Sequence, residues 1–278
     1  MDRALALARR GLGNTWPNPA VGCVLVRDGR VVGRGWTQPG GRPHAEVRAL
    51  AQAGEAARGA TAYVTLEPCA HHGKTPPCAE ALIRSGVTRV VTALTDPDPR
   101  VSGRGHAMLR AAGIAVTEGV RESAAREAQR GFLTRVTLGR PMLTLKLATS
   151  FDGRIATALG ESQWITAPAA RRQVHALRLT HDAVMVGGGT ARADRPGLNV
   201  RGMGRVRQPV RVVVSSGPMP DLPPEGAEHG PLWQLADDPA AVMADLGARG
   251  LTRVLCEGGG ILAAGLLRAG LVDQLVGY

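Results

Sequence analysis

The sequence predicts two α/β domains joined in tandem. The chain has 278 residues, more than the roughly 100–200 that one domain usually holds. Apolar, β-branched runs alternate with helical patterns along its length, which is typical of layered α/β folds. The segment Gly139-Arg140-Pro141 interrupts this alternation near the middle of the chain. We therefore expect one domain over residues 1–139 and a second over residues 140–278.

The first half predicts a sheet covered by helices. Asp28-Gly29 separates two apolar runs and favours a hairpin turn between the first two strands. Gly11 is a plausible helix C-cap, and Pro76-Pro77 suits the start of a helix because proline is tolerated at the first helical position. We predict strands over residues 21–26, 31–36, 61–66 and 89–94, and helices over 2–11, 44–54, 78–85, 103–112 and 121–137.

The second half predicts strands over residues 142–148, 182–187, 210–214 and 253–256, and a helix over 261–269. Two of these strands run into glycines, at 187–189 and 258–260. A glycine run before a helix can cradle an anion with its backbone N–H groups, although tight turns alone explain such runs equally well. The chain stops at Tyr278 within a further expected strand, so we expect an incomplete second domain with an unpaired sheet edge.

The charge of the chain suggests an anionic ligand. The formal net charge is +11 and the sequence pI is about 10.9, which suits nucleic acid or phosphorylated small molecules. Aromatic residues make up only 3%, so the stacking platforms of single-strand binders are scarce. No apolar run approaches the ~20 residues of a membrane span, and the N-terminus lacks a signal core. We expect a cytoplasmic protein without a membrane or nucleic-acid partner.

The four cysteines fall into two kinds. Cys23 and Cys256 lie in apolar runs and are expected to be buried thiols. Cys69 and Cys78 instead follow His44-Ala45-Glu46, and one imidazole with two thiolates fills three of the four tetrahedral positions that zinc prefers. An open fourth position indicates a catalytic zinc, which lowers the pKa of water from about 16 to about 7. Glu46 would move protons as a general acid/base, as in zinc deaminases.

Longer motifs make the chain resemble the bifunctional deaminase–reductase family of riboflavin biosynthesis. One departure from the general deaminase pattern, the eight residues between Cys69 and Cys78, is itself a feature of this family. The resemblance implies a cytidine-deaminase-like three-layer domain followed by a dihydrofolate-reductase-like domain, here truncated at the C-terminus. The matching segments are Pro17–Pro19, His44–Val47, Thr65–Cys69, Thr75–Cys78, Leu145-Lys146, Ser150–Arg154, Ser162–Thr166, Asp182–Thr190, Ala193–Leu198, Arg201 and Glu257–Gly259.

The resemblance also implies the chemistry. The first domain would hydrolytically deaminate the diaminopyrimidinone ribosylamine 5′-phosphate, with Zn²⁺ as the cofactor. The second would use NADPH to reduce the ribosyl group to a ribityl chain. The resemblance implies a phosphorylated pyrimidine substrate, and we also expect a homo-oligomer.

The residues implied by the resemblance divide between the two halves. In the first half, Glu46 is the catalytic residue, and the metal ligands are His44, Cys69 and Cys78. The substrate contacts there are Asn18, His71 and Lys74, with Lys74 near the phosphate. In the second half the substrate contacts are Ser162, Arg178, Leu198, Arg201 and Glu257. The cofactor contacts are Ala148, Trp164, Thr190, Asp194, Gly258, Gly259 and Gly260, with Lys146 and Asp194 as candidates for polar support.

Some of these positions have simpler interpretations. Judged by residue type alone, Trp164 and Leu198 would be core residues and Arg178 a solvated helix residue. Thr37 and Ser215 depart from the family pattern, which often has His and Asp at these positions. If the histidine of relatives helps to bind the substrate, we expect Thr37 to give a weaker substrate affinity.

Three alternative functions remain open from the sequence. The second half could be a degenerate reductase, leaving a deaminase alone. The positive charge allows a nucleic-acid deaminase that acts on a flipped tRNA base, which predicts RNA binding with a steep salt dependence. A zinc-stabilised scaffold without activity would need a fourth protein ligand, for which His71 and His72 are the candidates.

Overall fold

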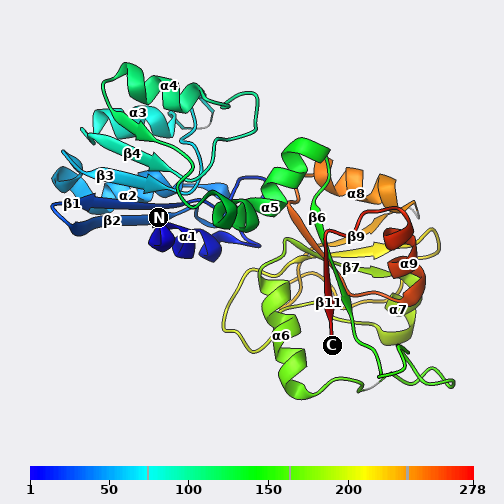
Figure 1. Cartoon of the computed structure of the whole chain (residues 1–278). Helices are drawn as coiled ribbons and strands as arrows, with labels where there is room; N and C mark the ends of the chain where they lie inside the picture. Colours follow the sequence, from blue (N-terminus) through cyan, green and yellow to red (C-terminus); the bar gives the residue numbers. More distant parts are fainter. Residues whose placement is uncertain (74, 163, 236–237) are drawn as a thin grey trace. The chain divides into compact units, whose positions relative to one another are not determined.

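The protein is described by a computed structural model that covers residues 1–73, 75–162, 164–235 and 238–278. The chain divides into two compact units, Met1–Thr137 and Leu138–Tyr278, each with its own sheet and core (Figure 1). Within the described ranges, no helix combines the length and the apolar character that crossing a bilayer requires.

The first unit is a three-layer α/β structure. Its five-stranded sheet has the order β2-β1-β3-β4-β5, in which β1 is antiparallel to β2 and β3 while β3, β4 and β5 run parallel. Figure 1 shows α3 and α4 on one face of this sheet and α1 on the other. The elements are α1 (Asp2–Ala8), β1 (Gly22–Arg27), β2 (Arg30–Trp36), α2 (Ala45–Ala53), β3 (Thr61–Val64), α3 (Cys78–Arg84), β4 (Arg89–Thr92), α4 (Arg104–Ala111), β5 (Ala115–Thr117) and α5 (Glu122–Leu138).

The predicted strands and helices of this unit are confirmed within a few residues. The hairpin turn at Asp28-Gly29 has φ angles of 50° and 71°, as a two-residue turn between twisted strands requires. The short edge strand β5 was not predicted, because three residues that are not fully buried carry little periodic signal.

Helix α2 lies unusually close to the sheet. A Cβ on Gly35 of β2 would lie 2.1 Å from the Ala45 carbonyl oxygen, and one on Gly33 would lie 2.3 Å from the Ala49 carbonyl oxygen. Only glycine allows the backbones of α2 and β2 to approach this closely. This contact fixes the position of the N-terminus of α2, which carries His44 and Glu46.

The second unit has a six-stranded, all-parallel sheet of order β11-β6-β10-β7-β8-β9. Its central strands are continuously apolar, as strands buried on both faces are, and Figure 1 shows α6 on one face with α8 and α9 on the other. The elements are β6 (Met142–Leu147), α6 (Pro168–Leu179), β7 (Ala183–Gly187), α7 (Gly188–Asp194), β8 (Val210–Val214), β9 (Leu232–Leu235), α8 (Pro239–Ala248), β10 (Arg253–Cys256), α9 (Gly260–Arg268) and β11 (Gln274–Gly277).

The parallel topology determines where a ligand site can form. The carboxyl ends of β6, β7 and β10 lie at the same edge of the sheet, because neighbouring parallel strands point the same way. At this edge each strand passes into a loop or a helix, which are the loop that begins at residue 148 after β6, α7 after β7 and residues 257–259 after β10. The two predicted core thiols, Cys23 and Cys256, are fully buried in their respective units.

Candidate active sites

Three potential metal ligands converge at the carboxyl end of β3 in the first unit. His44 is the N-cap residue of α2, Cys69 follows β3, and Cys78 is the first residue of α3. The ligand atoms of these residues lie within 4.8 Å of one another. The His44 Nδ1 atom lies 3.3 Å from the Cys78 Sγ and 3.7 Å from the Cys69 Sγ. Two helix N-termini and one strand end therefore bring the three side chains together.

The eight-residue loop between the cysteines is closed at its base by two hydrogen bonds. The Cys78 N–H donates to the Cys69 Sγ at 3.2 Å, and the Ala79 N–H donates to the Cys69 carbonyl oxygen at 3.2 Å. Hydrogen bonds from Cys78 and His44 lower the pKa of Cys69 to about 4. At neutral pH, this sulfur is therefore a thiolate, the form that binds metals.

The donor set fits a zinc ion. One imidazole nitrogen and two cysteine sulfurs within 4.8 Å of one another could supply three of the four ligands of a tetrahedral zinc ion, which would leave one position open. Among the described residues, neither His71 nor His72 joins this cluster, and the His72 Nε2 instead pairs with the Glu80 carboxylate at 2.9 Å. A closed four-ligand scaffold thus finds no support in this geometry.

Glu46 lies in the first turn of α2, two residues after His44, and only 4% of it is exposed. Burial raises the pKa of its carboxyl group, and the nearby charge of His44 opposes that rise. A carboxyl group with a raised pKa can both accept and donate a proton near neutral pH, as a general acid/base must.

Glu67 is a residue of this region whose role sequence reasoning missed. Its carboxylate is buried and accepts hydrogen bonds from the backbone N–H groups of Asp96, Gly103, Gly105 and His106, at 2.9–3.3 Å. A Cβ on Gly105 would lie 2.0 Å from the Pro68 carbonyl oxygen. The segment 96–106 is therefore anchored against the strand end that carries Cys69. The position of Glu67 within the Thr65–Cys69 motif was the feature of the sequence that could have indicated this role.

The predicted substrate contacts of the first unit are placed as follows. The Asn18 side-chain amide donates to the Gly41 carbonyl oxygen at 2.8 Å, three residues before His44. The buried His71 Nδ1 has no hydrogen-bond partner within the described part of the chain. Lys74 lies outside the described residues. Thr37 is buried and its hydroxyl accepts from the Val21 N–H at 3.0 Å, so it stabilises the start of β1.

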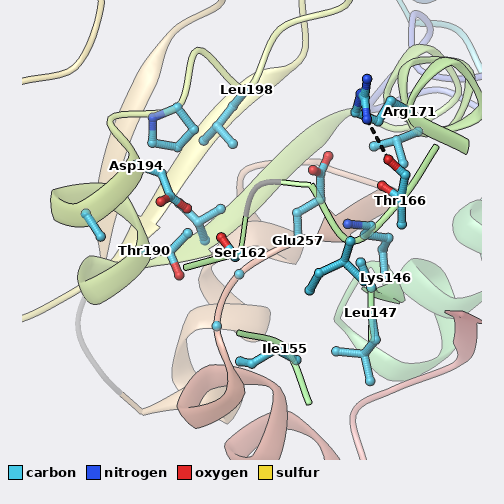
Figure 2. Close-up of a pocket in the computed structure, with 18 of the residues that line it drawn as sticks. Lys146, Leu147, Ile155, Ser162, Thr166, Arg171, Thr190, Asp194, Leu198 and Glu257 are labelled. Atoms are coloured by element: carbon cyan, nitrogen blue, oxygen red, sulfur yellow. Dashed lines mark hydrogen bonds between the residues drawn. The ribbon is translucent and has the colours of Figure 1, made fainter. Parts of the chain in front are cut away.

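The second unit holds a cavity of about 840 Å³ at the carboxyl edge of its sheet. Figure 2 shows Thr190 and Asp194 of α7 on one side of it, Lys146 and Leu147 of β6 on the other, and Glu257 between them. All the residues that the family resemblance implies for this half line this one cavity: Ser162, Arg178, Leu198, Arg201 and Glu257 for the substrate, and Ala148, Trp164, Thr190, Asp194, Gly258, Gly259 and Gly260 for the cofactor.

Arg178 and Glu257 form an ion pair at the wall of the cavity. The Arg178 Nε and Nη2 atoms donate to the two Glu257 oxygens at 2.6 and 2.8 Å, and Nη1 donates to the Asn199 carbonyl oxygen at 2.7 Å. The side chains are 11% and 10% exposed. Residue type alone suggested a solvated arginine, which is wrong here because the Glu257 carboxylate compensates its charge. Nearby, burial lowers the pKa of Lys146.

Two apolar residues differ from expectations based on residue type. Trp164 is 68% exposed rather than part of the core, and the Arg171 guanidinium stacks on its ring at 4.6 Å. Leu198 is buried and also lines the cavity, so it belongs to both the core and the site.

Gly258 allows the loop after β10 to pass close to β7. A Cβ at this position would lie 2.5 Å from the Val186 Cα and 2.7 Å from the Gly187 nitrogen. Gly259 has a φ of 56°, which favours glycine. This backbone approach brings Glu257 and the start of α9 to the cavity, where the N–H groups of a helix start can bind an anion.

Family models match both halves of the chain. Residues 1–94 match the cytidine and deoxycytidylate deaminase zinc-binding region, and residues 141–278 match the RibD C-terminal domain. The described residues fit these assignments, with the His44, Cys69 and Cys78 cluster in the first region and the cavity in the second.

Curated relatives extend over both halves. The chain is 44% identical to the riboflavin biosynthesis protein RibD of Escherichia coli, over 100% of this chain and 86% of that protein. It is 45% identical to RibD of Mycobacterium tuberculosis, over 100% of this chain and 84% of that protein.

Solved structures agree with these sequence relatives. Acinetobacter baumannii RibD matches with a TM-score of 0.90 at 43% identity, covering 100% of this chain and 85% of that chain. A Thermotoga maritima diaminohydroxyphosphoribosylaminopyrimidine deaminase/5-amino-6-(5-phosphoribosylamino)uracil reductase matches with a TM-score of 0.88 at 39% identity, covering 100% and 84%. These matches favour neither a deaminase alone nor a nucleic-acid deaminase. The chain belongs to the RibD family of riboflavin biosynthesis, as a bifunctional enzyme with a zinc-binding deaminase domain and a nicotinamide-dependent reductase domain.

Proposed function

We propose that the protein first deaminates the diaminopyrimidinone ribosylamine 5′-phosphate and then reduces the ribosyl group of the product with NADPH. The two activities would correspond to residues 1–139 and 140–278. The observation that carries this proposal is the presence of both sites in one chain, the His44, Cys69 and Cys78 cluster and the cavity at the carboxyl edge of the second sheet. The substrate is the one named for the Thermotoga maritima relative.

For the deamination, His44, Cys69 and Cys78 would hold the zinc ion. When bound, zinc supplies Lewis acidity that brings the pKa of a coordinated water near 7. Glu46 is buried in the first turn of α2 beside the ligands, where its carboxylate takes a proton from the attacking water. The same group passes this first proton to the ring nitrogen beside the amine-bearing carbon and then moves the proton of the new hydroxyl to the amine. The amine leaves as ammonia, and the ring carbon becomes a carbonyl.

Recognition of the pyrimidine in the first unit is assigned to Asn18, His71 and Lys74. His71 is supported by its buried Nδ1 atom, for which the described part of the chain provides no partner. Asn18 is supported by its hydrogen bond to Gly41, which fixes its amide next to the segment leading to His44. Lys74 rests on the family resemblance and would contact the phosphate as a cation.

For the reduction, the nicotinamide cofactor is assigned to Ala148, Trp164, Thr190, Asp194 and the glycines 258–260. Backbone N–H groups at the start of α9 would receive its phosphates. The deaminated pyrimidine is assigned to Ser162, Arg178, Leu198, Arg201 and Glu257. The lining of one cavity by both sets supports a direct hydride transfer between the two ligands, because the reacting carbons must approach each other within about 3–3.5 Å.

One experiment separates the two activities. The purified protein is incubated with the phosphorylated diaminopyrimidine, with and without NADPH, while ammonia release and NADPH oxidation are measured independently. We expect ammonia release in both mixtures and NADPH oxidation only after deamination, with NADPH preferred over NADH. Ammonia release without any NADPH oxidation would reject the reductase assignment, and the absence of both would reject the substrate.

Self-association is also expected, and exposed apolar side chains of the second unit support it. Phe151 is fully exposed, and Leu159 and Ile261 are 88% and 93% exposed. A second copy of the chain that covered these side chains would remove their apolar surface from water. Light scattering of the purified protein at several concentrations measures the oligomeric state, and a monomer throughout would contradict this expectation.

A further inference from the structure

Helix α6 turns three basic side chains toward the reductase cavity. Arg171, His175 and Arg178 are spaced four and three residues apart, so they lie on one face of the helix, and all three line the cavity. Arg171 stacks on Trp164, and Arg178 pairs with Glu257. His175 was not predicted as a site residue, and its environment gives it a separate role.

The His175 Nδ1 atom lies between two backbone groups of the same segment. It is 3.2 Å from the Asn199 carbonyl oxygen and 3.2 Å from the Arg201 backbone nitrogen. A ring nitrogen that carries a hydrogen donates to a carbonyl, and one that lacks a hydrogen accepts from an N–H, so only one of these bonds exists at a time.

The surrounding hydrogen bonds favour the second of these bonds. The Asn199 carbonyl oxygen already accepts a hydrogen bond from the Arg178 Nη1 at 2.7 Å. The Arg201 N–H, by contrast, points to the His175 Nδ1 as its acceptor. The neutral tautomer with hydrogen on Nε2 therefore gives both backbone groups a partner. Partial burial, reinforced by the charges of Arg178 and Arg201, lowers the pKa of His175 and keeps the ring neutral.

The segment held in this way is strained. Leu198 has a φ of 50°, a left-handed conformation that is costly for a branched side chain and persists only where its surroundings enforce it. Several contacts do so here. Gln208 accepts from the Val200 N–H at 2.7 Å, the Asn199 amide donates to the Glu228 carbonyl oxygen at 3.0 Å, and His175 holds the N–H of Arg201.

We infer that His175 is a positioning residue of the reductase site. Its neutral ring accepts the Arg201 N–H and thereby keeps Leu198 and Arg201 in the conformation in which they line the cavity. The functional consequence rests on the proposed function, in which Leu198 and Arg201 contact the phosphorylated pyrimidine. Loss of the His175 bond releases the C-terminal end of this segment, so it weakens pyrimidine binding while the cofactor contacts on α7 and the glycine loop stay in place.

The test compares two substitutions at this position. In His175→Asn the side-chain oxygen takes the place of Nδ1 and still accepts an N–H, whereas His175→Ala removes the acceptor. Equilibrium binding of 5-amino-6-(5-phosphoribosylamino)uracil and of NADPH is measured by calorimetry on the 278-residue chain. We expect the alanine variant to bind the pyrimidine about tenfold more weakly, as the loss of one hydrogen bond predicts. The asparagine variant should stay within threefold of wild type, and NADPH affinity should be unchanged in both.

A second measurement does not depend on the ligand. The ¹⁵N chemical shifts of the His175 ring in the unsubstituted protein report which nitrogen carries hydrogen, and we expect the Nε2–H tautomer. The inference is overturned if the ring carries hydrogen on Nδ1, if the alanine variant binds the pyrimidine as wild type does, or if both variants lose equal affinity. If the unsubstituted protein does not bind this pyrimidine at all, the proposed substrate is wrong, and the tautomer still decides the position of the His175 bond.

Discussion

The two units of the chain build their sites in opposite ways. In the first unit, three ligand atoms within 4.8 Å and one buried carboxylate come from the starts of two helices and the end of one strand. In the second, a cavity of about 840 Å³ collects residues from strands, loops and helices between residues 145 and 260. The first site depends on a few atoms held close together, and the second depends on many separate segments.

This difference changes what a substitution is expected to do. A site made of four groups loses its whole function when one of them is removed, because each group has a chemical role that no other can fill. A site distributed over a cavity loses affinity in steps, since each contact contributes only part of the binding free energy. The following predictions, from the largest expected effect to the smallest, test this contrast.

Removal of the metal should have the largest effect. A chelator that extracts zinc is expected to abolish ammonia release completely, because the Lewis acid is lost, and readdition of zinc should restore it. NADPH oxidation with 5-amino-6-(5-phosphoribosylamino)uracil supplied directly should continue at its original rate. Ammonia release that persists in protein shown by elemental analysis to be metal-free would contradict the zinc assignment.

Glu46→Gln should remove catalysis and keep the metal. The amide has nearly the shape of the carboxylate but cannot shuttle a proton, so the rate of ammonia release is expected to fall by roughly 10²–10⁴. Zinc content and the reductase rate with the deaminated intermediate serve as controls and should equal those of wild type. Turnover near the wild-type rate would exclude Glu46 as the acid/base.

Arg178→Met should mainly destabilise the second unit. The Glu257 side chain is only 10% exposed, so removing its partner leaves a buried carboxylate uncompensated, at a cost of about 3 kcal/mol in the free energy of unfolding. The double variant Arg178→Met/Glu257→Gln should recover part of that loss, because the unpaired charge is gone. Denaturant unfolding measures both, and equal stabilities of the single and double variants would mean that the ion pair is not coupled as described.

Titration of His181 should have a smaller, pH-dependent effect on the stability of the second unit. Its Nδ1 donates to the Leu177 carbonyl oxygen at 2.7 Å, its Nε2 lies 2.9 Å from the Thr144 hydroxyl, and full burial lowers its pKa to about 3. The unfolded chain binds a proton near pH 6.5 and the folded chain does not. Stability is therefore fully present above pH 6.5 and is lost as the pH falls, by about 2 kcal/mol between pH 8 and pH 5.

The matching control is His181→Asn, which keeps a donor for the Leu177 carbonyl but does not titrate. Between pH 8 and pH 5, the free energy of unfolding of the variant should fall by about 2 kcal/mol less than that of the wild type. Parallel pH profiles of the two proteins would show that His181 is accessible to protons in the folded state.

The sequence was sufficient to predict most of the local structure. The hairpin at Asp28-Gly29 follows from turn chemistry. The strands β7 and β8 follow from runs rich in β-branched and other apolar residues, although β8 also contains the buried Arg211. Strands β5 and β9 and helices α6, α7 and α8 were not predicted. Residues 115–117 are short and incompletely buried, and residues 232–235 are all only half-buried, so their periodicity is weak.

Contacts between residues that lie far apart in the chain could not be predicted from the sequence. Nothing in the spacing of Arg178 and Glu257 indicates that they pair with each other, since 79 residues separate them. The four backbone hydrogen bonds that Glu67 accepts depend on how the segment 96–106 folds back. The role of His175 likewise depends on a loop 24–26 residues away. Motifs predict residue types with a chemical role, whereas partners follow only from the tertiary fold.

The closed base of the loop between Cys69 and Cys78 has a consequence for enzyme engineering. Because the Cys78 and Ala79 N–H groups both bond to Cys69, the loop meets the metal cluster through a fixed junction. We therefore expect exchanges of side chains within residues 70–77 to change the contacts with the substrate more than the spacing of Cys69 and Cys78. Grafting other loops onto this junction offers a way to redirect the deaminase toward new aminated heterocycles.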